Sequence, residues 1–264
     1  MLAFIIRPTN FIPLLLLSTY VFFTSRQYFG RYLLWSLPLL FLFFHYSYST
    51  YQTILPPYYV PGWWGENPAP AESLLGTLLS PSRGLFIFSP VLIFSIYGIL
   101  LRLKTLRSAS LEICLAAIIF IHWIVISHRL WYGGWSLGPR FFTDMLPYFA
   151  YFLIPVFERF AGSAASPGRS AYVFSVLLAT SVFVHFRCAT NWGPDQWNSI
   201  PNNVDENNYR LWDWSDVQFL RGLCREPRYA APECWFDRIE QQDGTGSSNH
   251  ASRFPALLST KDIR

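Results

Sequence analysis

The sequence contains little charge. Asp, Glu, Lys and Arg make up 14% of the 264 residues, whereas soluble globular domains carry about 25%. Uncharged, mostly apolar stretches separate the few charged residues, notably between Arg7 and Arg26, Arg31 and Glu66, Arg83 and Arg102, and Arg169 and Arg187. This pattern excludes an ordinary soluble domain and predicts that much of the chain lies in a membrane.

The sequence also lacks the short motifs of several common enzyme classes. It contains no phosphate-cradling Gly-rich loop, no GxSxG elbow, no HExxH pair and no paired-cysteine metal site. The net charge of +4 does not indicate a nucleic-acid partner, because much of it lies in short loops between apolar blocks. We therefore expect neither a bound metal nor nucleic-acid binding.

The lengths of the apolar blocks predict transmembrane helices, because about 20 apolar helical residues cross a bilayer. We expect an all-α integral membrane protein, with a bundle of about six transmembrane helices in residues 1–187. Residues 188–264 are expected to form a mostly irregular, Trp-rich extracytoplasmic tail, disordered from about residue 241. The predicted spans are 10–23, 32–49, 85–101, 111–127, 141–157 and 171–186.

Basic residues in the short loops predict the orientation. Arg26 and Arg31 lie between the first and second spans. Arg102, Lys104 and Arg107 lie between the third and fourth, and Arg159 and Arg169 lie between the fifth and sixth. The positive-inside rule puts these loops in the cytoplasm. The loops at 50–84 and 128–140 and the tail are then outside. This orientation also leaves the amino terminus outside, so we expect that upstream helices are missing.

Two arginines on the predicted outer face are candidates for binding an anion. Arg83 and Arg140 each precede an apolar span, and a helix amino terminus favours an anion through its dipole and unpaired N–H groups. The guanidinium fork also matches phosphate geometry. In the alternative interpretation, Arg140 pairs with Asp144 one helical turn later and anchors the span. The two interpretations are compatible.

Other ionisable residues nominate no catalytic base. Asp144 lies near the membrane edge, where an ionisable residue is a functional candidate. His128, beside Arg129 at the outer mouth, is a better candidate than the lone histidines inside spans. Cys224 and Cys234 lie in the predicted outer tail and are separated by a short Pro-containing loop, so we expect a disulfide between them. The further candidate acids are Glu66 and Glu72, and the lone histidines inside the predicted spans are His45 and His122.

Four segments resemble a known family: RPTN, LLSPSRGLFIFSPVL, WYGGWSLGPRFFTDMLPYF and NVDENNYRLWDWSDVQFLRGL. They are similar to the carboxyl-terminal half of bacterial multi-pass glycosyltransferases of the GT-C superfamily, akin to dolichyl-phosphate-mannose–protein mannosyltransferases. The resemblance implies a bacterial plasma-membrane protein that takes sugar from a polyprenyl-phosphate-linked donor on the extracytoplasmic face. Arg83 and Arg140 would hold phosphate, Asp144 would orient Arg140, and Trp131 and Trp135 would stack on sugar or prenyl groups.

The family's catalytic Asp lies in a first outer loop that nothing in this chain matches. We therefore expect a truncated chain, or one that works with a missing amino-terminal half or partner chain, and we assign no catalytic residue. The second hypothesis is a non-catalytic membrane binding protein or partner subunit that displays the Trp-rich tail. A transporter is disfavoured, because the spans show almost no buried charge and no internal repeat.

The orientation can be tested with single cysteines introduced at Thr105 and Ser215. An impermeant thiol reagent applied to intact cells should label position 215 and leave position 105 unlabelled, because the basic 102–107 loop is expected in the cytoplasm. Labelling at 105 without labelling at 215 would overturn the orientation.

Overall fold

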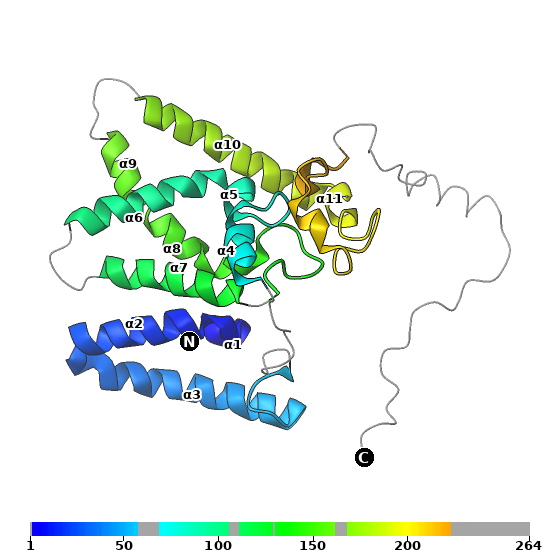
Figure 1. The fold of residues 1–264 in the computed structure, drawn as a ribbon. Coiled ribbons are helices and arrows are strands. Elements are labelled where there is room, and N and C mark those ends of the chain that lie inside the picture. The colour runs from blue at the N-terminus through cyan, green and yellow to red at the C-terminus, as the bar shows by residue number, and fades with distance from the viewer. Residues whose placement is uncertain (1, 58–68, 106–110, 129, 162–167, 223–264) are drawn as a thin grey trace, which may run out of the picture. The chain divides into compact units, whose positions relative to one another are not determined.

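The computed structural model describes residues 2–57, 69–105, 111–128, 130–161 and 168–222 (Figure 1). Its regular structure in these residues is helical, without a strand, and residues 1–224 form one compact unit. The α-helices are α1 Leu2–Ile6, α2 Phe11–Thr24, α3 Arg26–Tyr51, α4 Pro70–Leu79, α5 Leu85–Phe88, α6 Ile93–Thr105, α7 Leu111–Ser127, α8 Leu146–Tyr151, α9 Ile154–Ala161, α10 Arg169–Thr190 and α11 Gly193–Gln196. The 3-10 helices are η1 Pro8–Asn10, η3 Pro90–Leu92, η4 Arg140–Met145, η5 Asn208–Trp212 and η6 Gln218–Leu220.

Four of the predicted spans are continuous helices. Helix α7 has the predicted bounds. Helix α2 matches the predicted span at 10–23 to within one residue. Helices α3 and α10 extend beyond the predicted spans at 32–49 and 171–186 at both ends. Helix α2 packs against both α3 and α7. Long uncharged apolar blocks thus indicated these four helices correctly, although the bounds of α3 include Arg26 and Arg31 at its start.

The predicted span at 85–101 is not one helix. It is divided into α5, η3 and α6, and the break falls at Ser89, whose backbone is non-helical at φ −131° and ψ 64°. Proline disfavours α-helical backbone in the residue before it and has no N–H to donate. Pro90 therefore ends α5 and starts a new helical segment.

The predicted span at 141–157 is also broken. The segment begins as η4, continues as α8 and resumes after Phe152 and Leu153 as α9. Pro147 and Pro155 lie near the starts of α8 and α9, respectively, where a missing N–H costs no helical hydrogen bond. The backbone carbonyl of Phe152 lies against Gly98 of α6, so the second break is covered by a close helix contact.

Helix α4 was not predicted, because residues 50–84 were interpreted as a loop. Pro70 is its first residue and Glu72 lies in its first turn, and both are favoured at a helix amino terminus. These two signals were available in the sequence. Helix α4 contacts α5 and α7, and Trp131 lies against its Gly76.

One described helix is long and apolar enough to cross a membrane, namely α10. Only 22% of its most apolar window is buried inside the protein, unlike the core helix of a soluble domain. Two further apolar stretches, Pro8–Thr24 and Leu111–Ser127, are shorter. The structure therefore supports a mostly helical chain with one helix of membrane-spanning length, and it does not establish six spans.

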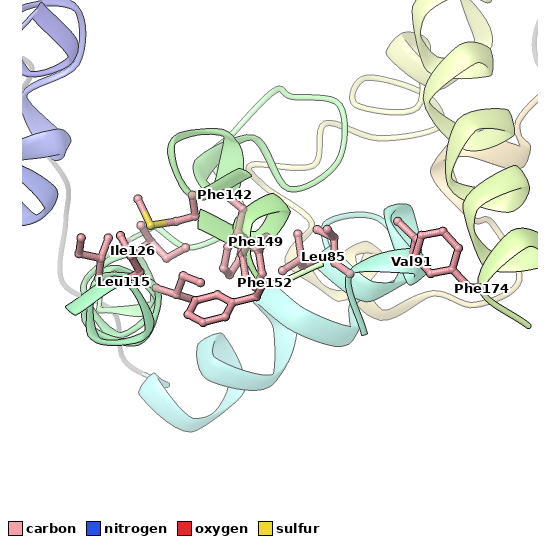
Figure 2. Close-up of a cluster of buried hydrophobic side chains, with 12 residues drawn as sticks. Leu85, Val91, Leu115, Ile126, Phe142, Phe149, Phe152 and Phe174 are labelled. Carbon is pink, nitrogen blue, oxygen red and sulfur yellow. The ribbon is translucent and has the colours of Figure 1, made fainter. Parts of the chain in front are cut away.

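The main core is formed by apolar side chains from α5, η3, α7, η4, α8 and α10. Figure 2 shows Phe142, Phe149 and Phe152 between the side chains of α7 and Leu85. Phe152 is fully buried, and the other two are 2% exposed. The broken segment 140–153 thus supplies the centre of the core, where it joins α7 to α5.

Residues on both sides of the predicted boundary at residue 187 lie in the same compact unit. Helix α10 continues to Thr190, and residues 191–222 belong to the same compact unit as the helices. The tail is mostly irregular as expected, with three short helical segments, α11, η5 and η6, in its described part. The expected disorder from about residue 241 lies outside the described residues.

Replacing Gly98 with Ala should destabilise the protein, because the added Cβ would overlap the Phe152 carbonyl, a backbone atom with little freedom to move. Overpacking of this kind costs about 1–3 kcal/mol. We expect a lower melting temperature for the detergent-purified variant.

Gly30→Ala is the matched control, because nothing lies within 4 Å of a Cβ built on this residue of α3. Alanine is favoured over glycine inside a helix by about 0.5–1 kcal/mol, so this variant should melt at the wild-type temperature or above it. Equal melting temperatures for Gly98→Ala and wild type would contradict the close contact.

Candidate functional site

The turn before α5 is joined to the tail. The hydroxyl oxygen of Ser80 accepts the backbone N–H groups of Ser82 and Arg83, at 3.3 and 3.2 Å. The same hydroxyl donates to the carbonyl of Leu211 at 2.6 Å. All of these groups are buried. The turn is thereby fixed, and it presents the Arg83 side chain towards the 131–136 loop and the tail.

Arg83 is only 2% exposed, and its guanidinium is fully bonded. Each of its five N–H bonds has an acceptor at 2.7–3.1 Å: the carbonyls of Ser82, Tyr132 and Gly134, Gln218 Oε1 and Asn198 Oδ1. No donor remains for a phosphate. The prediction that Arg83 holds phosphate is not supported by this geometry, which instead makes Arg83 the joint between three segments.

The acceptors around Arg83 are all neutral, so its charge is stabilised by dipoles. Burial, followed by the positive charge of Arg140, lowers the pKa of Arg83 to about 9, while the carboxylate of Asp205 opposes this effect. The guanidinium therefore stays protonated at neutral pH. Arg83 and Arg140 are close enough to repel each other, although only Arg140 is exposed.

Trp197 lies fully buried between two guanidinium groups. The guanidinium carbon of Arg83 is 5.4 Å from the centre of its ring, and that of Arg210 is 4.3 Å away. The indole N–H donates to the carbonyl of Asp216 at 2.7 Å. Cation–π contacts are stronger when the partners are removed from water, so Trp197 stabilises the folded tail and is not available to a ligand.

Arg83, Arg140 and Trp131 line one cavity. Its volume is about 10 Å³, close to the smallest that holds one water molecule. A phosphate group is too large to enter it. A ligand of that size would bind over the open side, where Arg140 lies. The remaining lining residues are Thr77, Ile126, Tyr132, Gly138, Pro139, Phe141 and Phe142.

Arg140 is exposed, and among the described residues its guanidinium has no hydrogen-bond acceptor or carboxylate partner. Its guanidinium carbon lies 5.3 Å from the centre of the Phe141 ring, and its Nε lies beside Gly133. An exposed cation held against an aromatic ring at the edge of a cavity keeps its donors free for a ligand.

The predicted pair between Arg140 and Asp144 is wrong. Asp144 accepts hydrogen bonds from Arg7 at 3.1 Å and from the Thr9 hydroxyl at 3.0 Å. The prediction assumed an α-helix, in which positions four apart face each other. Residues Arg140–Met145 form a 3-10 helix instead, in which positions three apart coincide. The carboxylate therefore points away from Arg140 and joins the amino-terminal segment to η4.

The other predicted aromatic and histidine candidates differ in exposure. Trp131 is 8% exposed, and its ring lies against Gly76 and 6.3 Å from the Trp212 ring. Trp135 is 56% exposed, and its N–H donates to Asn203 Oδ1 at 2.9 Å. His128 is exposed at the end of α7. Of the two predicted tryptophans, Trp135 offers the accessible ring face.

Sequence reasoning missed two polar residues, Tyr132 and Asp205, next to the Gly133–Gly134 turn that Arg140 also contacts. The Tyr132 hydroxyl interacts with the Asp205 carboxylate: burial, then the charge of Asp205 and a hydrogen bond to it, raises the pKa of Tyr132. Asp205 is exposed and lies against Gly134. Tyr132 and Asp205 come from separate loops, so no local spacing could have indicated that they meet.

Several candidates remain untested by the structure. Cys224, Cys234 and Glu66 lie outside the described residues, so the expected disulfide stays a prediction.

The remaining candidates have protein partners. Glu72 accepts a hydrogen bond from the Trp212 N–H at 2.9 Å. His122 is buried on α7, with Nε2 placed 3.2 Å from the Phe141 carbonyl. Within the described residues, no group of three His, Cys, Asp or Glu could hold a metal ion.

The sequence matches no protein-family model, no curated protein and no solved structure.

Arg83 and Arg140 should respond differently to the same substitution. Arg83→Met would leave Asn198 Oδ1 and the carbonyls of Ser82 and Gly134 without the donor they have in wild type, at about 1–3 kcal/mol for each unsatisfied group. We expect this variant to melt well below wild type and to be cleaved readily by protease in 191–222. Arg140→Met removes an exposed side chain without a described bonding partner, so its melting temperature should stay near that of wild type. Equal destabilisation by the two substitutions would contradict this division of roles.

Proposed function

We propose that the protein is a multi-pass protein of the bacterial plasma membrane that binds a lipid-linked phosphate on its extracytoplasmic face. In this proposal it is a GT-C-like glycosyltransferase that uses a polyprenyl-phosphate-linked sugar, or the carboxyl-terminal fragment of one. The observation that carries the proposal is the exposed guanidinium of Arg140, which has no partner among the described residues and lies at a cavity that Tyr132 also lines.

Apolar side chains on the outside of the described helices support the membrane part of the proposal. Trp35 and Phe41 of α3 are 79% and 70% exposed, and Tyr172 and Phe186 of α10 are 72% and 64% exposed. Large apolar patches on a protein surface indicate a partner or a membrane. Lipid hydrocarbon would cover these helices without any further protein.

The electrostatics support an anion as the ligand. Arg140 and the buried Arg83 repel each other, and a phosphate bound to Arg140 would relieve this repulsion while Arg83 keeps all its protein hydrogen bonds. A cation near the hydrocarbon edge is costly without compensation, and lipid phosphates can provide it. Trp135, with its exposed ring, can stack on the sugar or prenyl group.

The second candidate function is a non-catalytic binding protein or partner subunit. The exposed aromatic side chains of the tail favour it, because Trp192, Tyr209 and Trp214 are 64%, 64% and 59% exposed. Tyrosine and tryptophan are enriched in protein interfaces. A co-purified partner that protects these three residues from modification would favour this function.

Arg140→Lys tests the phosphate site. Lysine keeps the charge and loses the planar fork, so affinity for polyprenyl phosphate should fall about tenfold, or ~1.4 kcal/mol, as measured by titration of the detergent-purified protein. Folding should be unaffected, because the side chain is exposed.

Arg26→Lys is the control. Arg26 is also exposed and stacks on an aromatic ring, at 5.1 Å from the centre of Phe22, but it lies on the predicted cytoplasmic side. This variant should bind polyprenyl phosphate as wild type does. Unchanged affinity in Arg140→Lys, or an equal loss in both variants, would refute the site.

A further inference from the structure

Two opposite charges flank the Gly133–Gly134 turn. A Cβ built on Gly133 would lie 2.9 Å from Arg140 Nε, and one built on Gly134 would lie 3.6 Å from Asp205 Oδ1. Both glycines have positive φ, of 72° and 63°, a conformation that other residues rarely adopt. The turn therefore separates a guanidinium from a carboxylate by two consecutive small residues.

The two charges are exposed and do not pair with each other in the described part of the chain. Asp205 is held in place by other groups. Asn203 Oδ1 accepts both the Trp135 indole N–H at 2.9 Å and the Asp205 backbone N–H at 3.1 Å. The Tyr132 hydroxyl interacts with the carboxylate. Asn203 thus links the backbone of Asp205 to the indole N–H of the accessible Trp135.

A carboxylate at this position is unfavourable for a ligand that is only a phosphate, because the two negative charges repel each other. It is favourable for a ligand that also carries hydroxyl groups, because an ionised carboxylate accepts strong hydrogen bonds from O–H donors. The exposed ring of Trp135, whose N–H shares Asn203 Oδ1 with the Asp205 backbone, offers an apolar face to a sugar ring. The combined chemistry therefore matches a phosphorylated sugar better than a bare phosphate.

We propose that Asp205 is the sugar-recognising residue of the Arg140 site, so that Arg140 takes the phosphate and Asp205 takes sugar hydroxyls. This assignment rests on the proposed function. It adds a selectivity that Arg140 alone does not provide: a sugar-bearing phosphate is preferred over the same lipid phosphate without sugar.

The test compares three ligands on the full chain in detergent: polyprenyl phosphate, the same lipid phosphate carrying a sugar, and a soluble sugar phosphate. Asp205→Asn should weaken binding of the sugar-bearing lipid about tenfold, the size expected for a hydrogen bond to a charged group. Binding of the bare lipid phosphate should stay equal or become tighter, because a repulsive charge is removed. Tighter binding of the lipid-linked sugar than of the soluble one would identify the lipid as the source of the headgroup.

Two further variants keep the result interpretable. Glu206→Gln removes the same charge from the neighbouring exposed residue and should leave all three affinities unchanged. Tyr132→Phe keeps the buried ring and removes the hydroxyl, so it should weaken sugar-bearing ligands alone, by about threefold.

An equal effect of Asp205→Asn on the sugar-bearing and bare lipid phosphates would overturn the assignment, and so would an effect of Glu206→Gln of the same size. Failure of the proposed function is distinguishable: in that case Arg140→Lys would change the affinity for none of the three ligands.

Discussion

A full positive charge is enclosed at the meeting point of the loops, and the arrangement of the site depends on it. Transfer of an ion from water into protein costs several kcal/mol unless hydrogen bonds compensate it, and Arg83 has no carboxylate bonded to it. Its acceptors come from the turn before α5, the 132–134 loop and the tail, so all three segments must be in place together. Gln218 strengthens this connection, because its oxygen also accepts the Gly138 N–H and its amide donates to the carbonyls of Ser136 and Pro194.

The need of a buried guanidinium for hydrogen-bond acceptors gives different roles to two arginines that have the same local sequence signal. Both precede apolar helical segments, and both were predicted to bind an anion. Arg83 is surrounded by acceptors from distant segments and becomes part of the structure, whereas Arg140 lies on the rim with its donors free of described partners. The buried charge still acts on the site through its repulsion of Arg140. In the proposed anion site, Arg140 would be the direct ligand and Arg83 a fixed neighbouring charge.

The sequence predicted helices well where an apolar block continues without interruption, as in α7 and α10, because composition and length decide such cases locally. It failed at 85–101 and 141–157, where prolines change the backbone in ways that an average over the block conceals. The Asp144 pairing failed for a related reason, since a 3-10 turn changes which side chains face each other. The contacts of Asp205 and Gln218 were beyond prediction, because they join loops far apart in the sequence.

The breaks in the two proline-containing segments are compatible with a membrane only because the protein covers them. Backbone groups freed at membrane depth must find partners inside the protein. At the first break, the Val91 N–H donates to the Ser181 hydroxyl, and the Ser89 hydroxyl forms a hydrogen bond of 2.8 Å with His185 Nε2. Both partners belong to α10, the helix of membrane-spanning length. The polar residues of α10 thus satisfy the interruption before α6. These hydrogen bonds hold the break against α10, and the turn that carries Arg83 lies only one short helix, α5, before it.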